Sequence, residues 1–288
     1  MSEPKKSLTE PPTNLKEAID WVLRVSGGDH HGGFDADRLV KALVKPDDLN
    51  INGQNVNIKT LIGTVGNGLS KFIGYKYTGR GYKIEIDGDG IVKSGEVKHN
   101  STPSAYTSAY TGSWYTHVSA GSPQNPTDKE ITCARIFFTA IKKIFEGLTA
   151  LYYNCKAEWK TENLGGSNLK QFMEKNGFSG TEHNTDMTGN QIITKALKDF
   201  NEFTTAYNSV GENASLDAFR SQLEQNASTS PSQSPLSTLY ILATYVYVRS
   251  TSPVTPSFLG YSGTAALAGG AYGLNLGGLG TFMSALLA

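Results

Sequence analysis

The paired histidines His30 and His31 are the first residues of the chain whose types suggest chemistry, because they follow Asp29 and precede two glycines. Imidazole and carboxylate groups are common ligands of zinc and copper. Adjacent histidines chelate one ion poorly, however, and no third ligand follows at a suitable spacing. We therefore interpret this stretch as a solvated turn and predict no metal site.

Two glycine-containing motifs resemble ligand loops but lack a required residue. The run Asp87-Gly-Asp-Gly resembles the start of a calcium-binding loop. An EF-hand loop needs Glu at its twelfth position, however, and this position is Lys98. The glycines at 63, 66 and 68 lack the Gly-Lys-Ser/Thr of a phosphate-binding loop and the strand that precedes a dinucleotide fingerprint. The sequence predicts no bound cofactor.

The pair Cys155 and His183 could act as nucleophile and base, but only the fold can bring such a pair together. No catalytic residue is predicted, and an enzyme whose site assembles spatially around His183 or His30 remains the alternative. Cys133 lies 22 residues before Cys155 in one apolar run. A straight helix would separate them by about 33 Å, whereas a disulfide needs about 4.4–6.8 Å between Cα atoms. We therefore expect two free thiols.

Apolar residues recur at helical spacing along much of the chain. Asn14 and Glu17 form a capping-box pattern at the first such stretch, and glycines predict a kink or split near Asn67 in the third. The predicted helices are 14–25, 35–44, 57–73, 127–155, 167–176, 188–209, 215–226 and 235–249, with a Ser/Pro linker, STSPSQSP, before the last.

Alternating residues at 82–86 and 91–93 flank the Asp-Gly run and predict a β-hairpin. The expected fold is mainly α: an irregular multi-helix bundle with a small β-hairpin and long loops. We divide it into a flexible lead (1–12), a helical domain (13–250) with a loop-rich insertion (74–126), and a Gly-rich apolar C-terminal segment (251–288).

The longest predicted loop, 99–127, is rich in Tyr, Ser, Thr and Gly, the residue types of adaptable binding surfaces. Its aromatic residues are candidate partner-binding residues: Tyr106, Tyr110, Trp114 and Tyr115. The alternative is that they pack back onto the core, as aromatic side chains usually do.

Charge and hydropathy limit the classes of partner. Lys+Arg and Asp+Glu are 26 each, so the net charge is zero and no basic footprint for nucleic acid is present. No charged residue follows Arg249, but Pro253, Pro256 and eight glycines from Gly260 to Gly280 interrupt the apolar stretch. We expect a loop with short buried or interfacial helices there, with membrane association through 257–288 as the alternative.

Several stretches resemble the variant erythrocyte surface antigen family of Babesia parasites. They follow one another in order over most of the chain: PTNLKEAIDWVLRVSG, GLSKFIGY, CARIFF, LYYNCKAEW, KALKDFNEF, SPLSTLYILATYVY and PSFLGYSGTAALAGGAYGLNLGGLGTFMSALL.

This resemblance implies a variant antigen that is exported to the infected erythrocyte surface without a classical N-terminal signal peptide. Its implied roles are antigenic variation, immune evasion and cytoadhesion, without catalysis. The implied partners are host-cell surface proteins and host antibodies, and a related family subunit is a further candidate. Larger members carry more cysteines and a transmembrane helix, which this sequence lacks in clear form, so membrane anchoring stays open.

Overall fold

The computed structural model describes residues 6–25, 48–51, 53–72, 75–77, 82–84, 109–110, 128–178, 187–251, 265–267, 270–272 and 274–275. Most of these residues are helical, so the fold is mainly α, as predicted. The predicted helix 35–44, strand 91–93 and most of the Tyr-rich loop lie outside the described residues.

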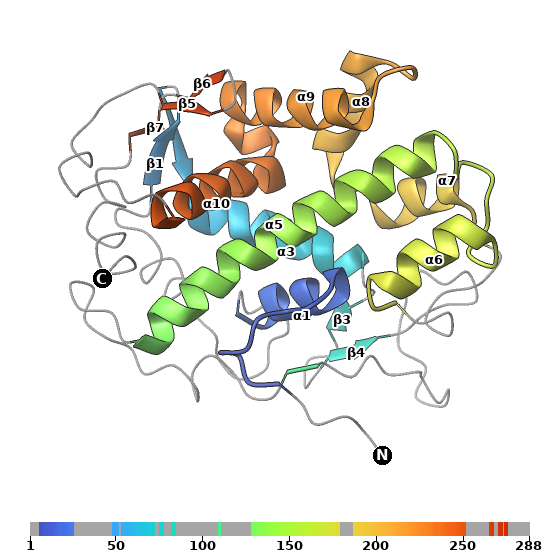
Figure 1. Ribbon diagram of the computed structural model, residues 1–288, viewed down its shortest axis with the longest axis horizontal. Coiled ribbons are helices and arrows are strands. Elements are labelled where there is room, and N and C mark those ends of the chain that lie inside the picture. Colours follow the sequence, from blue (N-terminus) through green and yellow to red (C-terminus); the bar gives the residue numbers. More distant parts are fainter. Residues whose placement is uncertain are drawn as a thin grey trace.

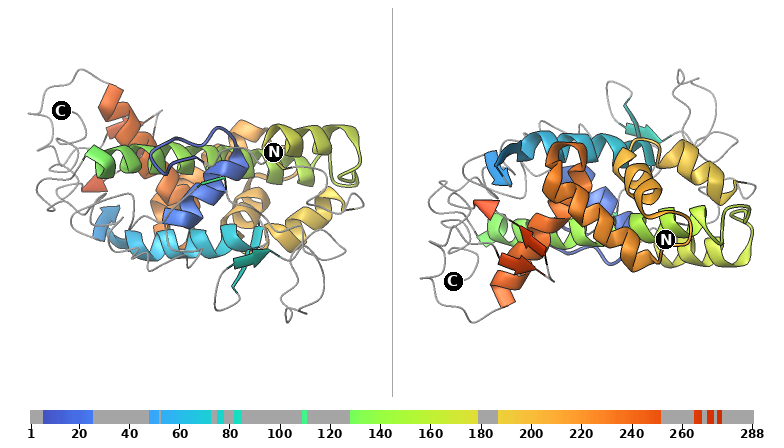
Figure 2. Two further views of the ribbon diagram at one scale, coloured as in Figure 1. Left: turned by 90° about the horizontal axis from the view of Figure 1, so that it is seen from below. Right: turned by 90° about the horizontal axis from the view of Figure 1, so that it is seen from above.

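Four helices form the centre of the molecule. The longest, α5 (Asp128–Lys156), runs obliquely across Figure 1. Helix α1 (Leu15–Val25) contacts both α5 and α3 (Ile58–Phe72). Helix α10 (Pro235–Thr251) also contacts both, on the other side, as the two views in Figure 2 show. Thus α1 and α10 each bridge α5 and α3.

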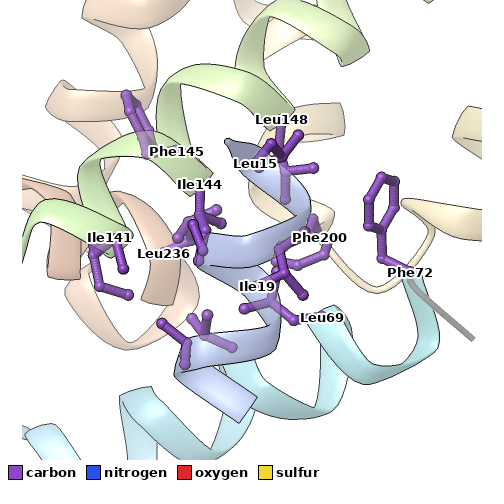
Figure 3. Close-up of a cluster of buried hydrophobic side chains, with 14 of the residues drawn as sticks. Leu15, Ile19, Leu69, Phe72, Ile141, Ile144, Phe145, Leu148, Phe200 and Leu236 are labelled. Carbon is purple, nitrogen blue, oxygen red and sulfur yellow. The ribbon is translucent and has the colours of Figure 1, made fainter. Parts of the chain in front are cut away.

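One hydrophobic core joins these helices, and its members run from Leu8 to Ala243. Helix α5 is apolar on more than one face because it lies among several helices. Figure 3 shows part of this core, where side chains of α1 lie between those of α5 and α3. The labelled residues are Leu15, Ile19, Leu69, Phe72, Ile141, Ile144, Phe145, Leu148, Phe200 and Leu236.

The predicted cap of α1 is present in a modified form. The side-chain oxygen of Asn14 accepts a hydrogen bond from the Glu17 backbone N–H at 2.9 Å. The Glu17 carboxylate, however, accepts from the backbone N–H of Thr13, at 2.8 Å, rather than from that of Asn14. The box is therefore shifted by one residue toward the N-terminus.

Gly68 in α3 and Gly147 in α5 allow close packing, and the glycines of both helices do not interrupt them. A β-carbon on Gly68 would lie 2.9 Å from the Phe200 ring, and one on Gly147 would lie 2.9 Å from Leu15 Cδ2. Helix α3 is a single element, so the predicted split near Asn67 is wrong. Helix α5 passes Gly147 unbroken, and Cys133 and Cys155 are both buried and form no disulfide, as expected.

The helix predicted over 188–209 is wrong as one element. The structure has α7 (Gly189–Gln191), a π-helical turn η1 (Ile192–Ala196) and α8 (Asn201–Val210). The break allows Phe200 to enter the core, where it is 3% exposed. Apolar spacing alone does not reveal this break, because both halves bury their apolar residues.

Two further helices agree with the expectations more closely. Helix α6 (Ser167–Lys175) is followed by Gly177, whose φ of 87° lies in the left-handed region that favours glycine. Helix α9 (Leu216–Thr229) is capped by Ser215 and continues into the predicted linker, which also contains the 3₁₀ turn η2 (Pro231–Gln233). The linker is therefore largely helical.

The strands are short, and the pairing predicted between 82–86 and 91–93 lies outside the described residues apart from 82–84. Strand β4 (Tyr82–Ile84) pairs with the preceding β3 (Tyr75–Tyr77), and residues 85–93 lie outside the described residues. A second, unpredicted hairpin joins β1 (Asp48–Ile51) and β2 (Gln54–Asn57) through Gly53, whose φ is 84°.

The C-terminal segment contains strands where short helices were expected. They are β5 (Ala265–Leu267), β6 (Gly270–Tyr272) and β7 (Leu274–Asn275). Strands β5 and β6 pair, and β7 pairs antiparallel with β1, which gives the order β2-β1-β7. No helix in the described part of the chain is both long and apolar enough to cross a membrane.

Residues 6–12 are docked on the helices, in contrast to the flexible lead predicted over 1–12. Leu8 is fully buried, and its carbonyl oxygen accepts a hydrogen bond from Trp21 Nε1 at 2.9 Å. The helical domain therefore begins at least as early as residue 6.

We predict that Gly189→Ala lowers the free energy of unfolding by about 2 kcal/mol, a typical cost of overpacking. A β-carbon there would overlap the Trp159 carbonyl oxygen and press on Cys155 Sγ. Gly63→Ala is the matched control, because Gly63 faces open space inside α3; it should raise stability by about 0.5–1 kcal/mol. Urea unfolding followed by circular dichroism measures both, and equal effects would contradict the packing described at Gly189.

Candidate functional site

Tyr110 is one of the four candidate partner-binding residues, and its side chain is fully buried. At this position the structure therefore favours the alternative, packing onto the core, because burying a large aromatic surface is more favourable than leaving it in water. The other three candidates, Tyr106, Trp114 and Tyr115, lie outside the described residues.

Ala109, the residue before Tyr110, forms hydrogen bonds through both its N–H and its carbonyl group. The Ala109 N–H donates to Asp20 Oδ2 at 2.9 Å, and the Ala109 carbonyl oxygen accepts from the Lys6 N–H at 2.8 Å. Residues 109–110 thus lie between α1 and the N-terminal segment, at the lower edge of Figure 1. We call Ala109 and Tyr110 the anchor.

The electrostatics of the anchor keep the Tyr110 phenol protonated. Burial raises its pKa most, and the nearby carboxylates of Glu17, Asp20 and Glu10 raise the pKa further because they disfavour a second negative charge. The tyrosine is therefore a neutral core side chain at any physiological pH.

Asp20 was not singled out by sequence reasoning, although it lies inside the apolar stretch of α1. It is fully buried, and its carboxylate accepts from a residue 89 positions away. A carboxylate buried in this way needs hydrogen-bond donors to offset the loss of hydration. The only signal in the sequence is an acidic residue between Ile19 and Trp21, which are both apolar.

Glu202 is a second buried carboxylate that the sequence did not reveal. Located on α8, it caps the N-terminus of α10. Its Oε1 accepts from the Leu236 N–H at 3.1 Å, and its Oε2 accepts from the Ser237 N–H at 3.0 Å and the Ser237 hydroxyl at 2.6 Å. These bonds satisfy donors that the first turn of a helix leaves unpaired.

Cys155 was considered as a nucleophile. It is fully buried in α5, and burial, aided by the negative charge of Glu162, raises the pKa of the thiol to about 12. A thiol with such a pKa is protonated at neutral pH and is a poor nucleophile. His183, its suggested partner, lies outside the described residues.

Aromatic side chains near the C-terminal end of α5 form a packed cluster with α8 and α9. Tyr152 contacts the rings of Phe203, Tyr207 and Phe219 at centroid distances of 5.4 to 6.1 Å. The Lys156 ammonium lies 6.0 Å from the Tyr152 ring centroid, in cation–π range. This cluster fixes three helices to one another.

Potential metal ligands do not gather at one place in the described part of the chain. No cluster of three or more His, Cys, Asp or Glu residues that could hold a metal ion occurs there. The histidines at 30, 31, 99, 117 and 183 all lie outside the described part.

Comparison with known proteins returned no match: no family model, no curated protein and no solved structure is similar to this chain.

We predict that neither of the two thiols reacts with a disulfide reagent in the folded protein at mildly alkaline pH. Both are buried, and Cys155 has a raised pKa. Both should react once guanidinium unfolds the chain, which gives the full count of two. Rapid labelling of the native protein, measured by absorbance, would contradict this burial.

We predict that Glu202→Ala lowers the free energy of unfolding by about 3 kcal/mol, because it removes a helix cap and leaves buried N–H groups unpaired. Glu174→Ala is the matched control, since Glu174 is half exposed and lies 3.9 Å from Lys170 on the same helix. Exposed pairs of this kind contribute about 0–1 kcal/mol. Equal losses in urea unfolding would argue against the cap.

The pH dependence of stability provides a second test of Glu202. Burial raises its pKa above the ordinary 4.5, although hydrogen bonds from Ser237 and Leu236 oppose the shift. The folded state therefore binds the proton more tightly than the unfolded chain does. The contribution of protonated Glu202 to the free energy of unfolding is fully present below pH 4.5 and is lost as the pH rises through the folded pKa. The stability of the wild type relative to Glu202→Gln should thus fall as the pH rises from 4.5 through the folded pKa; a rise would contradict the shift.

Proposed function

We propose that the chain is a non-catalytic variant surface antigen of infected erythrocytes, in which a packed helical framework carries connecting segments that contact host cells and host antibodies. Its proposed location is the erythrocyte surface. Its proposed partners are a host-cell surface protein, antibodies and a related family subunit.

The observation that carries this proposal is the continuous core. It joins residues from Leu8 to Ala243 through helices that contact one another directly. A framework that is complete in this way tolerates sequence change in the stretches between its elements, since loops carry few of the packing contacts. The Tyr-rich stretch between β4 and α5 is the longest of these, and it touches the core at the anchor.

The placement of the stretches that resemble the antigen family supports the same reading. Those around Asn14, Cys133 and Cys155 lie on α1 and α5, and those at 195–203 and 234–247 lie on η1, α8 and α10. All of these elements contribute side chains to the core. These stretches thus belong to the framework, whereas the last and longest one, 256–287, lies mostly outside the described residues.

Three ionisable side chains that are buried in the framework have structural environments or roles. Asp20 holds the anchor, Glu202 caps α10, and Cys155 is buried with a protonated thiol. None of the three is placed to receive a substrate, which is why we favour a binding function over catalysis.

The first experiment measures binding of the fluorescently labelled chain to intact host cells by flow cytometry. The test variant carries Tyr106→Ser, Trp114→Ser and Tyr115→Ser, with Tyr110 left unchanged because it is buried. We expect a loss of at least tenfold in apparent affinity with an unchanged melting temperature.

The matched control variant carries Lys160→Ser, Lys170→Ser and Lys175→Ser, which change three exposed positions of the framework. It should bind host cells like the wild type. Equal binding by both variants would remove the three aromatic residues from the proposal. No binding by the wild-type chain would overturn the adhesive function itself.

The second experiment tests the proposed location. Antibodies raised against the purified chain should label intact infected erythrocytes. Labelling only after permeabilisation would place the protein inside the cell and contradict the proposal.

A further inference from the structure

The N-terminal segment before α1 is joined to both α1 and α5. The Leu8 side chain is buried in the core, and its carbonyl oxygen accepts from Trp21 Nε1 on α1 at 2.9 Å and from the Cys133 thiol on α5 at 3.8 Å. Pro12 is buried as well. This segment therefore closes one end of the contact between α1 and α5.

An ion pair secures the same segment to α1. Lys6 Nζ lies 2.6 Å from Glu17 Oε2, and the same oxygen accepts from the Thr13 hydroxyl at 2.8 Å. Partial burial raises the pKa of Glu17, but the bonds from Lys6 and Thr13 outweigh it and lower the pKa overall. The carboxylate thus stays charged and able to hold Lys6 at neutral pH.

The segment also contacts the anchor, which lies about one hundred residues further along the chain. Lys6 and Tyr110 form an isolated parallel bridge, and the Lys6 N–H donates to the Ala109 carbonyl oxygen at 2.8 Å. Glu10 is close enough to raise the pKa of Tyr110. The anchor is therefore held by α1 on one side and by residues 6–12 on the other.

We infer that residues 6–12 form a detachable clasp, which keeps the anchor in place when docked and releases it when withdrawn. Hydrogen bonds within the clasp join Ser7, Thr9 and Glu10 in one local turn, for example Glu10 N–H to the Ser7 carbonyl at 2.9 Å. Its attachment to the rest of the molecule comes instead from Leu8, Pro12 and the contacts of Lys6. Without it, the Ala109 carbonyl would lose its donor and Trp21 would lose its acceptor. The hydrogen bond from the Ala109 N–H to Asp20 Oδ2 would remain.

This gives the N-terminus control over a site that is remote in sequence. Any event that removes or displaces residues 6–12, such as proteolytic trimming, would change how firmly Ala109 and Tyr110 are held. The inference does not depend on host-cell binding, and it can fail or succeed without affecting the proposed function.

Hydrogen exchange followed by mass spectrometry tests the clasp directly. The test variant is the chain without residues 1–12, and the matched control lacks only residues 1–5, which precede the clasp. We expect the amides of Ala109 and Tyr110 to exchange at least tenfold faster in the longer truncation, with the amides of α9 equally protected in both. Equal protection of the anchor in the two truncations would overturn the inference.

A second pair of variants decides the question if the longer truncation also exposes α9. Lys6→Pro removes the N–H that bonds to Ala109 as well as the ion pair, whereas Lys6→Ala removes only the ion pair. Exchange at Ala109 at least tenfold faster in the proline variant supports the clasp. Equal exchange in the two variants overturns it.

Discussion

The packing of α1 between α5 and α3 is the constraint on which the rest of the structure depends. Leu15 fits against Gly147 of α5, where a β-carbon would lie within 2.9 Å of its methyl group. This close approach brings the whole length of α1 into the core, so that even Asp20 and Trp21 become buried. The α1 surface then offers the positions at which the N-terminal segment and the anchor attach.

Two buried carboxylates extend this framework to distant parts of the chain. Asp20 binds the backbone at Ala109, and Glu202 binds the backbone at Leu236 and Ser237. A buried carboxylate is costly unless donors surround it, so each of these contacts strongly favours one arrangement of the segments involved. Directional polar contacts thus position segments that nonpolar packing alone would leave less well defined.

Much of the helical framework could be predicted from the sequence, because apolar periodicity is a local property. The bounds of α1, α5 and α10 differ from the predicted ranges by only one or two residues. The break before Phe200 was not predicted, because the residues on both sides of it are apolar at helical spacing and are buried in the structure. The roles of Asp20 and Glu202 were missed because their partners lie 34 to 89 residues away. The pairing of β4 with β3 was not predicted, because the sequence between these strands, Thr78 to Gly81, carries no Asn-Gly or Asp-Gly turn signal.

The pairing of β7 with β1 has a consequence for the order in which the protein assembles. Strands β1 and β2 are neighbours in the chain and can associate as soon as both have left the ribosome. The third strand aligns Asn275 with Asn50, so it joins only after more than two hundred further residues have been synthesised. Closing so long a loop from an unstructured chain would cost about 5 kcal/mol of entropy, far more than one short strand returns. The helical core must therefore form first and bring the two ends together, which makes this small sheet a late reporter of correct folding.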